Sequence, residues 1–485
     1  MRKIFHFFIT LIILVSCNSG EQKASESTSA KGKAVEPTEE NYVKNIDLDQ
    51  IKEKGVLRAL TVYSPSNYFL YKGFSMGFEY ELLNNFSEYL GVDLQIIRVN
   101  NLDEVIPMLK RGEGDIIAHG LTVTEDRKKE VSFTDYHRLT HQVLVQRKPE
   151  NWRKMTLDEI DDVLVRNVIE LLNDTVSIRK NSSYLERINN IMKETGGTIY
   201  IDTIHGKYST EAIIEMVAKG DVKYTIADNN IADINKSNFS NIDVFTKLSL
   251  SQRISWSVRK DSPNLREEVN FWLKEIKKSG YFNIVFNKYY KNSKQYKKRI
   301  RSEYFSLKTG KISKYDDLVK EYSEKLGWDW RMLSSQIFQE SKFDHDKKSW
   351  TGAEGLMQLM PKTAQSLGMT NNTPEENVKA GTKYLKQIYG KWEDIPDSIQ
   401  RMKFTLASYN CGYAHVRDAQ KLAKREKTDS TRWDEGISKY ILMLSNSEYY
   451  NLPEVKYGYV RGRETYNYVE EIFDRYNNYK EFVEE

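Results

Sequence analysis

The sequence predicts a protein of several domains, in which a two-lobed α/β module precedes a mainly α-helical domain. Three observations predict this organisation. The chain has 485 residues, which is too many for one ordinary hydrophobic core. Strand-like and helix-like segments alternate from Leu57 onward, whereas beyond Ser313 only helical periodicity remains. Because 39% of the residues are hydrophobic and 12% are aromatic, the composition is sufficient for packed cores in both parts.

The first seventeen residues, MRKIFHFFITLIILVSC, combine a basic start with a short apolar run that ends at Cys17. The run is too short and too close to the terminus for an ordinary membrane span, and it has the layout of a secretory signal. The segment resembles a bacterial lipoprotein signal, which implies that Cys17 is lipidated and becomes the first residue of the mature chain. A plain signal peptide with a chance cysteine is the alternative. Both interpretations predict export.

Residues 18–45 form the next segment and are rich in Ser, Glu, Lys and Ala, with few large apolar groups. This composition is typical of a disordered tether, which would hold the folded part away from a membrane. If Cys17 is acylated, Cys411 is the only thiol left, so we expect no intramolecular disulfide. The seven histidines lack the spacing of metal ligands, and we expect neither a metal nor another cofactor. A net charge of +4 over this length gives no general electrostatic case for nucleic acid as a partner.

The α/β module is expected over residues 46–292. Its first lobe is predicted from a strand, a helix, a strand, a helix and a strand at 56–63, 77–91, 92–99, 102–115 and 116–123. Its second lobe is predicted from a strand and helix pattern at 174–180, 182–196, 198–202, 209–222 and 224–229. Alternation of this kind favours βαβ units and parallel strands. The extended segment 132–148 is expected to cross between the lobes, and 255–290 is expected to return to the first one.

A basic stretch separates the two parts of the chain. Residues 288–301 contain seven basic groups among tyrosines, and we expect a basic linker over 293–312. The stretch is interpreted either as a solvated helix end and connector or as a contact for an anionic membrane or polymer. Residues 313–485 then predict an all-α domain, with helices at 316–327, 330–343, 361–368, 377–392, 401–412 and 464–476.

A carboxylate lies on the apolar face of one of these helices. Trp330, Leu333 and Ile337 follow helical spacing, and Glu340 continues the same stripe. Burial disfavours the ionised form of a carboxyl group and raises its pKa toward neutrality, which suits a general acid. The alternative is a helix-terminal Glu whose side chain turns to solvent or caps a neighbouring loop.

The segment GAEGLMQLMP, residues 352–361, follows this helix. Its glycines permit close backbone approach, and Gln358 offers both a hydrogen-bond donor and an acceptor. Met357 and Met360 offer adaptable apolar walls, although both also suit an ordinary core. We expect this segment to line a groove for a sugar.

Four ordered motifs of the helical part carry a family resemblance. Glu340-Ser341 with Phe343, followed by Gly352-Ala353 and Gly355-Leu356-Met357-Gln358 with Met360-Pro361, resemble the two leading motifs of the soluble lytic transglycosylase catalytic domain. LASYNCG resembles that family's Ala-x-Tyr-Asn-x-Gly motif, at Ala407, Tyr409, Asn410 and Gly412. RETYNYVEEI resembles its closing Glu-Thr-x-x-Tyr-Val motif, at Glu464, Thr465, Tyr468 and Val469. The resemblance implies a lysozyme-like fold.

In the resembled family one glutamate does the chemistry. It protonates the glycosidic oxygen between N-acetylmuramic acid and N-acetylglucosamine, then takes the proton of the muramyl C6 hydroxyl, so that a 1,6-anhydro product forms without water. The resemblance makes Glu340 the catalytic residue. It implies substrate-binding positions at Ser349, Met357, Gln358, Met360, Tyr409, Asn410, Glu464 and Tyr468. A structural role is the alternative for Glu464, and Tyr468 is expected to pack under the cleft.

The α/β module resembles family 3 solute-binding proteins, which implies a fold like that of periplasmic binding proteins. Segments 77–94, 110–136 and 220–228 occur in the expected order. By this resemblance Arg127 would bind a ligand α-carboxylate and Asp228 an α-amino group, while Thr122 and Ser182 are further hydroxyl candidates. Pairing of Arg127 with Glu125 or Glu130 on the surface is the alternative for that residue.

Together the resemblances imply a peptidoglycan lytic transglycosylase that is regulated by an amino acid or muropeptide bound in the α/β module. Its expected partners are peptidoglycan, that effector and a membrane reached through the N-terminal lipid. Asn18 after the cysteine avoids the Asp that retains some lipoproteins in the inner membrane, so the sequence favours a periplasm-facing outer-membrane lipoprotein. Two alternatives remain open, a lysozyme-type hydrolase and a non-catalytic receptor of wall fragments.

Overall fold

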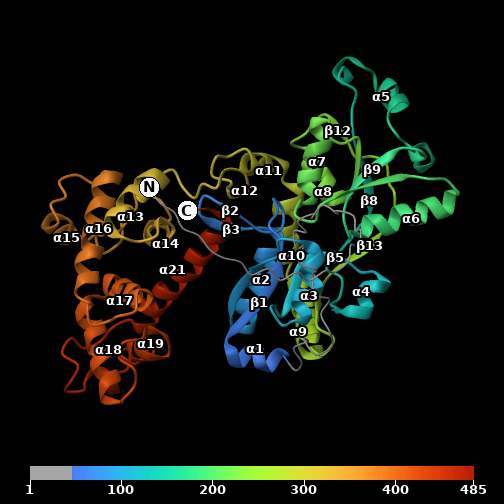
Figure 1. The fold of residues 1–485 in the computed structure, drawn as a ribbon. Helices are drawn as coiled ribbons and strands as arrows, with labels where there is room; N and C mark the ends of the chain where they lie inside the picture. Colours follow the sequence, from blue (N-terminus) through green and yellow to red (C-terminus); the bar gives the residue numbers. More distant parts are fainter. Residues whose placement is uncertain (1–45, 485) are drawn as a thin grey trace, which may run out of the picture. The chain divides into compact units, whose positions relative to one another are not determined.

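A computed structural model describes residues 46–484 of the chain. The predicted signal peptide with Cys17 and the predicted tether up to residue 45 lie outside the described residues. The described part consists of an α/β module and a helical domain, in the order that the sequence predicts (Figure 1).

The first lobe of the module is built around a sheet with mixed strand directions. Its elements are α1 (Leu48–Lys54), β1 (Val56–Thr61), β2 (Phe69–Tyr71), β3 (Phe74–Met76), α2 (Phe78–Leu90), β4 (Asp93–Arg98), η2 (Leu102–Glu104), α3 (Val105–Lys110), β5 (Ile116–Thr122) and α4 (Glu125–Glu130). With β13 (Gln252–Val258) and β6 (Ser132–Phe133), which follow later in the chain, the sheet has the order β4-β1-β5-β13-β6. β1 pairs in parallel with β4 and with β5, which confirms the predicted βαβ units. Phe78, Leu82 and Phe86 bury one face of α2 against this lobe.

The chain crosses between the lobes where the sequence predicts a crossing. The crossing segment contains β6 (Ser132–Phe133), β7 (Arg138–Thr140) and β8 (Gln142–Arg147). β7 pairs with β13 of the first sheet, whereas β8 pairs with β11 of the second lobe. β13 (Gln252–Val258) returns to the first sheet and pairs antiparallel with β5. The first lobe therefore contains antiparallel neighbours as well as the predicted parallel ones.

The second lobe contains two small sheets. Its elements are η3 (Trp152–Lys154), α5 (Leu157–Val163), η4 (Val168–Leu171), β9 (Thr175–Arg179), α6 (Ser183–Thr195), β10 (Tyr200–Ile204), α7 (Thr210–Lys219), β11 (Tyr224–Asp228), α8 (Asn229–Lys236) and β12 (Ile242–Asp243). β9 and β10 are parallel, and the second sheet has the antiparallel order β11-β8-β12. The predicted strands and helices of this lobe are confirmed.

The segment after β13 is helical and well packed. It contains α9 (Pro263–Lys278), α10 (Tyr281–Phe286), a π-helical turn η5 (Asn287–Lys291), α11 (Ser293–Ile300) and α12 (Ser306–Thr309). The stretch predicted as a basic linker thus folds as α11 and α12. Tyr296 and Phe305 are buried in the core of the first lobe, so apolar packing rather than solvation positions this stretch.

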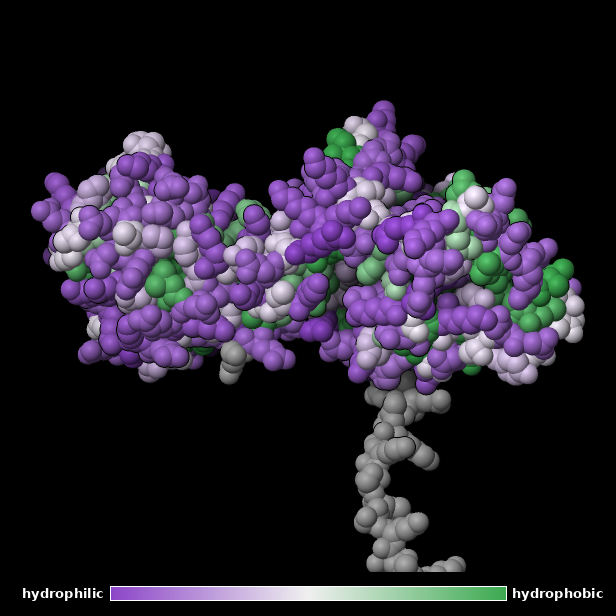
Figure 2. All heavy atoms as spheres, turned by 90° about the horizontal axis from the view of Figure 1, so that it is seen from above, coloured by the Kyte–Doolittle hydropathy of each residue, from purple (hydrophilic) through white to green (hydrophobic). Residues whose placement is uncertain are grey.

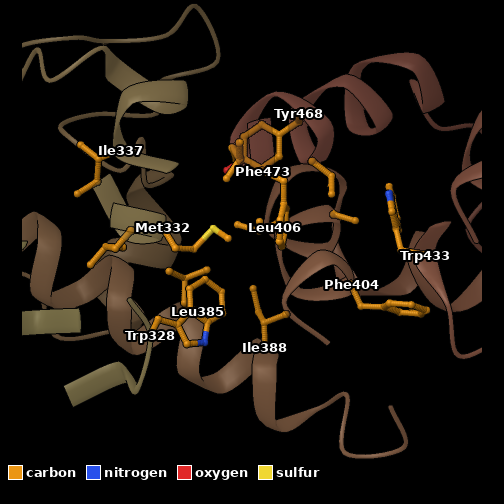
Figure 3. Packing of buried hydrophobic residues seen from close by; sticks show 14 of the residues in the cluster. Trp328, Met332, Ile337, Leu385, Ile388, Phe404, Leu406, Trp433, Tyr468 and Phe473 are labelled. Carbon is orange, nitrogen blue, oxygen red and sulfur yellow. The ribbon is translucent and has the colours of Figure 1, made fainter. Parts of the chain in front are cut away.

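The helical domain contains no strand among its described residues. Its helices are α13 (Asp316–Leu326), α14 (Trp330–Ser341), α15 (Pro361–Ser366), α16 (Pro374–Gly390), α17 (Ser398–Cys411), α18 (Tyr413–Arg425), the π-helical turn η6 (Trp433–Ile437), α19 (Ser438–Met443), α20 (Ser447–Tyr450) and α21 (Gly462–Phe482). α14 packs against α21 and α13. Residues contributed by several of these helices, such as Ile337, Leu385, Phe404 and Tyr468, meet in one core (Figure 3).

The last helix, α21, also contacts the α/β module. The Tyr479 hydroxyl donates to the carbonyl oxygen of Gly73 at 3.0 Å. The ring of Phe482 stacks on Tyr63 with 4.0 Å between the centroids. Arg98 of β4 donates to the carbonyl oxygen of Glu481 at 2.9 Å. α21 therefore belongs to the core of the helical domain and also contacts the α/β module.

Hydrophilic residues predominate on the face of the molecule drawn in Figure 2, and hydrophobic residues lie there in small groups. Over residues 46–484, every helix is either too short or too polar to span a bilayer.

Candidate active site

Glu340 is held at the end of α14 by the local sequence. Asp329 caps the start of this helix, because its side chain accepts a hydrogen bond from the backbone N–H of Arg331 at 2.8 Å. The helix ends after Ser341, where Lys342 and Phe343 adopt left-handed backbone angles with φ of 55° and 61°. This turn reverses the chain and returns the following loop to the helix, where Lys347 Nζ donates to the carbonyl oxygen of Glu340 at 2.5 Å.

The Glu340 carboxyl group is largely removed from water, as the apolar stripe predicts. Burial raises its pKa from 4.5 to about 7. Two neighbours act in the opposite direction, because the Tyr468 hydroxyl donates to Oε1 at 2.6 Å and the positive charge of Lys347 favours the ionised form. Burial is the largest cause, so the carboxyl group holds a proton near neutral pH and can release it there.

Tyr409 and Tyr468 are the two aromatic hydroxyls nearest to this chemistry. Burial and the charge of Glu340 raise the pKa of both phenols well above 10, so both are donors at any working pH. Tyr468 donates to Glu340 itself, whereas Tyr409 donates to the carbonyl oxygen of Met357 at 2.8 Å. The structure thus brings Glu340, Tyr409 and Tyr468 together.

Ser349 and Gln358 hold the loop that follows Glu340. The Ser349 hydroxyl accepts from the N–H of Ala353 at 2.9 Å, which closes a turn. Gln358 has a φ of 47°, and its amide nitrogen donates to the carbonyl oxygens of Lys347 and Gly355, both at 2.9 Å. Their side chains therefore fix the shape of the loop.

The two methionines differ, and one expectation is corrected. Met360 is 44% exposed at the start of α15, as a groove wall requires. Met357 is 0% exposed and belongs to the hydrophobic core, so its side chain is not a groove wall. The physical reason is its contact with α16, where a Cβ on Gly381 would lie 2.2 Å from the Met357 sulfur.

Two residues of the closing motif, Thr465 and Glu464, have different surroundings: Thr465 contacts another motif, and Glu464 lies at the surface. Asn410 Oδ1 accepts from the Thr465 hydroxyl at 2.8 Å, which links α17 to α21 near Tyr409. Glu464 is exposed and lies 3.5 Å from Arg461, so its side chain is occupied at the surface. Among the described residues, no hydrogen bond or ion pair connects Glu464 with Glu340, in line with the alternative structural role of Glu464.

Two polar neighbours of this site were not expected. Gln336 lies one helical turn before Glu340, and its amide nitrogen is 3.4 Å from the Tyr468 hydroxyl. That position was open to prediction, because i and i+4 share a helix face. Lys347 lies in an irregular loop, where no periodicity indicates the direction of a side chain.

The expected ligand residues of the α/β module meet around one cavity of about 60 Å³. It is lined by Arg127 and Thr122 of the first lobe and by Ser182 and Asp228 of the second. Arg127 donates to the carbonyl oxygen of Thr122 at 3.0 Å. Its alternative pairing on the surface is not found, because Glu125 pairs with Lys128 and Glu130 pairs with Lys110.

Asp228 and Ser182 lie differently in this cavity. Asp228 is buried, its Oδ1 has no hydrogen-bond partner among the described residues, and burial raises its pKa to about 6 against the opposing charges of Arg138 and Arg179. The Ser182 hydroxyl donates to the carbonyl oxygen of Arg179 at 2.6 Å, so it caps the local backbone. Asp228 is therefore the better placed of the two for a ligand.

Comparison with known families matches both parts of the chain. Residues 59–292 match bacterial extracellular solute-binding proteins, family 3, and residues 317–431 match the transglycosylase SLT domain. A membrane-bound lytic murein transglycosylase F from Desulfosudis oleivorans is 33% identical over 89% of this chain and 91% of its own length. The chain belongs to the membrane-bound lytic murein transglycosylase F family.

A second member of that family, from Pseudomonas putida, is 32% identical over 88% of this chain and 85% of its own length. A solved structure of holo ArgBP from T. maritima is 25% identical, with a TM-score of 0.40, over 49% of this chain and 97% of that one. The protein is thus a peptidoglycan lytic transglycosylase with a periplasmic-binding-protein-like module ahead of a lysozyme-like SLT domain. This outcome excludes the non-catalytic receptor.

Proposed function

We propose that this transglycosylase cleaves the β-1,4 bond between N-acetylmuramic acid and N-acetylglucosamine without water and leaves a 1,6-anhydromuropeptide, with Glu340 as acid and then base. The observation that supports this proposal is a buried carboxyl group without a carboxylate partner. Among the described residues, the groups that act on the pKa of Glu340 besides burial are Tyr468 and Lys347, and neither is acidic.

A lone carboxyl group suits this reaction better than hydrolysis by two carboxylates. Glycosidases with two carboxylates place them about 5 to 10 Å apart, and the second forms a covalent bond or activates water. With one carboxyl group, the nucleophile has to come from the substrate. The C6 hydroxyl of the muramyl residue is such a nucleophile.

The proposed cycle balances in protons and bonds. Protonated Glu340 gives its proton to the glycosidic oxygen as the C1–O bond breaks, and N-acetylglucosamine leaves with a free 4-hydroxyl. The carboxylate then accepts the proton of the muramyl C6 hydroxyl while O6 bonds to C1. Glu340 ends the cycle protonated, and no water is consumed.

Neighbouring side chains support both steps. A pKa of about 7 leaves a large protonated fraction at neutral pH for the first step. The Tyr468 hydroxyl, 2.6 Å from Oε1, and the charge of Lys347 stabilise the carboxylate between the steps. We assign Tyr409, Asn410, Ser349 and Gln358 to shaping the site around the muramyl residue, and Met360 to its apolar edge.

Mass spectrometry of digested murein sacculi tests this proposal. Chain lacking residues 1–17 is expected to release muropeptides that end in 1,6-anhydromuramic acid, and Glu340→Gln is expected to release none. A lysozyme-type hydrolase would instead give reducing ends whose mass is higher by one water. Reducing ends as the main product would overturn the proposal.

We also propose that a small effector bound in the module regulates the catalytic domain. α21 supplies the physical connection, because it carries Tyr468 at the catalytic site and Phe482 on Tyr63, and Tyr63 also lines the module cavity. An effector changes activity only if it binds the active arrangement more tightly than the inactive one. Equal turnover with and without bound effector would remove this part of the proposal.

Attachment to the membrane through a lipid on Cys17 completes the proposed function, with the catalytic domain facing the periplasm from the outer membrane. The apolar run before Cys17 and Asn18 after it support this location. A Cys17→Ser variant that still fractionated with the outer membrane after high-salt washing would contradict lipid anchoring.

A further inference from the structure

The cavity of the module contains more positive charge than the backbone of a bound amino acid requires. Three arginines line it, Arg127, Arg138 and Arg179, together with the acids Glu211 and Asp228. An α-carboxylate needs one guanidinium group, and an α-ammonium needs one carboxylate. The other charged groups of the cavity wall therefore influence which amino acid side chain the cavity accepts.

Arg138 has partners for its charge within the protein. Its Nη2 lies 3.9 Å from Glu79 Oε1, and its guanidinium lies over the rings of Phe78 and Tyr290 at 5.2 and 5.1 Å. Its Nε and Nη1 are buried without a hydrogen-bond partner among the described residues. Because a carboxylate and two aromatic faces already act on this guanidinium, less of its charge is left for a ligand than at an arginine without a nearby carboxylate.

Arg179 has no direct partner for its charge. It is the last residue of β9, and its side chain makes no hydrogen bond to any described residue and has no carboxylate within 4.0 Å among them, so Glu211, Asp228 and Asp103 act on it only from a greater distance. Its Nε is buried without a partner. Its charge also acts on Arg127, whose pKa is lowered by burial and then by Arg179. An unpaired guanidinium at this position favours an anion between the two arginines.

The other groups on the cavity wall agree with an anionic ligand. The amide nitrogen of Asn67 lies 3.0 Å from His119 Nδ1 and donates to it. Burial and the charges of Arg179, Arg138 and Arg127 lower the pKa of His119 well below 6.5, so the ring is neutral and its proton is on Nε2. Glu211 is already engaged, because its Oε1 accepts from the hydroxyls of Ser64 and Ser66.

We propose that the cavity binds an acidic amino acid, with its α-carboxylate on Arg127, its α-ammonium on Asp228 and its side-chain carboxylate on Arg179. The proposal rests on the proposed function, in which the module holds an amino acid or muropeptide effector, and it names the chemical class of that effector. Two carboxylates and one ammonium match two arginines without a carboxylate within 4.0 Å and one aspartate without a hydrogen-bond partner on its Oδ1, all among the described residues. A basic amino acid would instead place a cation beside Arg179.

The size of the cavity supports one amino acid rather than a disaccharide peptide, because its volume is only about 60 Å³. The lining residues also come from both lobes. Thr122 and Ser183 already contact each other across the lobes, with 3.1 Å between their hydroxyl oxygens. A small ligand is therefore enclosed by both lobes at once.

Isothermal titration of the chain lacking residues 1–17 tests the proposal with four probes. L-glutamate and L-aspartate are compared with L-glutamine, which has the shape of glutamate without its side-chain charge, and with L-arginine. We expect at least one of the two acidic amino acids to bind about tenfold or more tightly than glutamine, and arginine to bind most weakly, because charge-assisted hydrogen bonds are about twice as strong as neutral ones.

Substitution of Arg179 gives the specific control. Arg179→Met is expected to reduce the affinity for glutamate to that for glutamine while the affinity for glutamine stays within threefold of the original. Arg179→Lys should keep part of the preference. Arg187→Met is the matched variant, since Arg187 belongs to the same lobe but pairs with Glu194 at 2.8 Å, and it should leave the preference unchanged.

The outcomes distinguish the hypothesis of an acidic ligand from the more general hypothesis of an amino acid or muropeptide effector. Equal binding of glutamate and glutamine, or a preference that persists in a folded Arg179→Met variant, overturns the acidic ligand and leaves an amino acid effector in place. Binding of a muropeptide but of no free amino acid also overturns it. If neither amino acids nor muropeptides bind, the proposal that an effector regulates the enzyme is overturned as well. The proposed catalytic reaction is tested separately by the sacculus digestion.

Discussion

Glu340 in the helical domain and Asp228 in the α/β module both have carboxyl groups whose pKa values are raised by burial, to about 7 and about 6, although Glu340 is partly exposed and Asp228 is buried. Their surroundings differ. Glu340 accepts a hydrogen bond from a neutral tyrosine, whereas Asp228 faces Arg138 and Arg179 and keeps one oxygen without a partner among the described residues. The first arrangement holds a proton for transfer, and the second keeps a negative charge available for a ligand cation.

The comparison shows how the same physical cause serves two purposes. Burial raises both pKa values, but only Asp228 has two arginines whose charges oppose burial. A general acid needs its pKa near the working pH, while a binding carboxylate must stay ionised. The number of nearby cations is therefore what separates a proton donor from a ligand site in this chain.

The largest effect is expected when Glu340 loses its ability to transfer a proton, which tests its role as a proton donor directly. Glu340→Gln keeps the shape of the side chain and the oxygen that accepts from Tyr468, but it cannot transfer a proton. We expect muropeptide release to fall by roughly 10³-fold or more, measured as 1,6-anhydromuropeptides from sacculi. Glu321→Gln is the matched variant, because Glu321 is an exposed glutamate on α13 that pairs with Lys325, and it should keep basal release. Residual release above a few per cent in Glu340→Gln would contradict the single-acid mechanism.

The same substitution should change stability in a way that depends on pH. The folded pKa of Glu340, about 7, lies above its unfolded value of 4.5, so the folded state binds more protons between these values. Stability from the protonated group is complete below pH 4.5 and is lost as the pH rises through 7. The loss amounts to about 3 to 4 kcal/mol.

Chemical denaturation checks this prediction. At pH 8.5, Glu340→Gln should be more stable than the unchanged protein by up to that amount, and at pH 4 the two should be nearly equal. The same difference in the free energy of unfolding at both pH values would mean that the carboxyl group is not buried in solution.

Tyr468 offers a smaller and more selective change. Because the proton of Glu340 is needed, the rate should fall about tenfold per pH unit above its pKa of about 7. Tyr468→Phe removes the hydrogen bond that stabilises the carboxylate, so the alkaline limb should move to higher pH and the maximal rate should drop by about tenfold. Tyr476 lies on the same helix as Tyr468, and Tyr476→Phe, which removes a hydrogen bond to Asp329 at the start of α14, should leave the limb in place. If the alkaline limb of the pH–rate profile stayed in place in Tyr468→Phe, the tyrosine would have a packing role only.

Periodicity predicted most of the fold, because each expected segment has an apolar face that a core covers. Leu82 and Phe86 follow this rule in α2, and Ile337 follows it in α14. The buried position of Glu340 followed from the same stripe. α18 (Tyr413–Arg425) was not expected, although Val416, Ala419 and Ala423 are spaced for it, since it begins directly after Gly412 at the end of another helix.

What the sequence could not predict depends on tertiary contacts. Met357 has the same side chain as Met360, and only the approach of Gly381 decides that Met357 is buried. Gly120 is an ordinary strand residue in the pattern, yet it has a φ of +60° and a Cβ there would lie 2.6 Å from Arg138 Nη2. The position of Arg138 beside Glu79 and the lack of a carboxylate within 4.0 Å of Arg179 among the described residues follow from such contacts. Neither could be inferred from residue type.

The last and smallest effect concerns the connection between the two sites. Phe482 at the end of α21 stacks on Tyr63 at 4.0 Å, and Tyr63 lines the module cavity. Phe482→Ala removes this stacking but leaves Glu340 and Tyr468 untouched, so basal release should stay within twofold. We expect any change in release caused by saturating L-glutamate to shrink severalfold, because the coupling passes through a weaker contact.

The control for this prediction is Phe271→Ala, which truncates a half-exposed phenylalanine on α9 away from α21. It should leave both basal release and the response to glutamate unchanged. A response that survived intact in Phe482→Ala would mean that the two buried carboxyl sites communicate by another route or act independently. A loss of basal release together with the response would instead show that the stacking supports the fold of α21, since Tyr468 is fourteen positions earlier on the same helix.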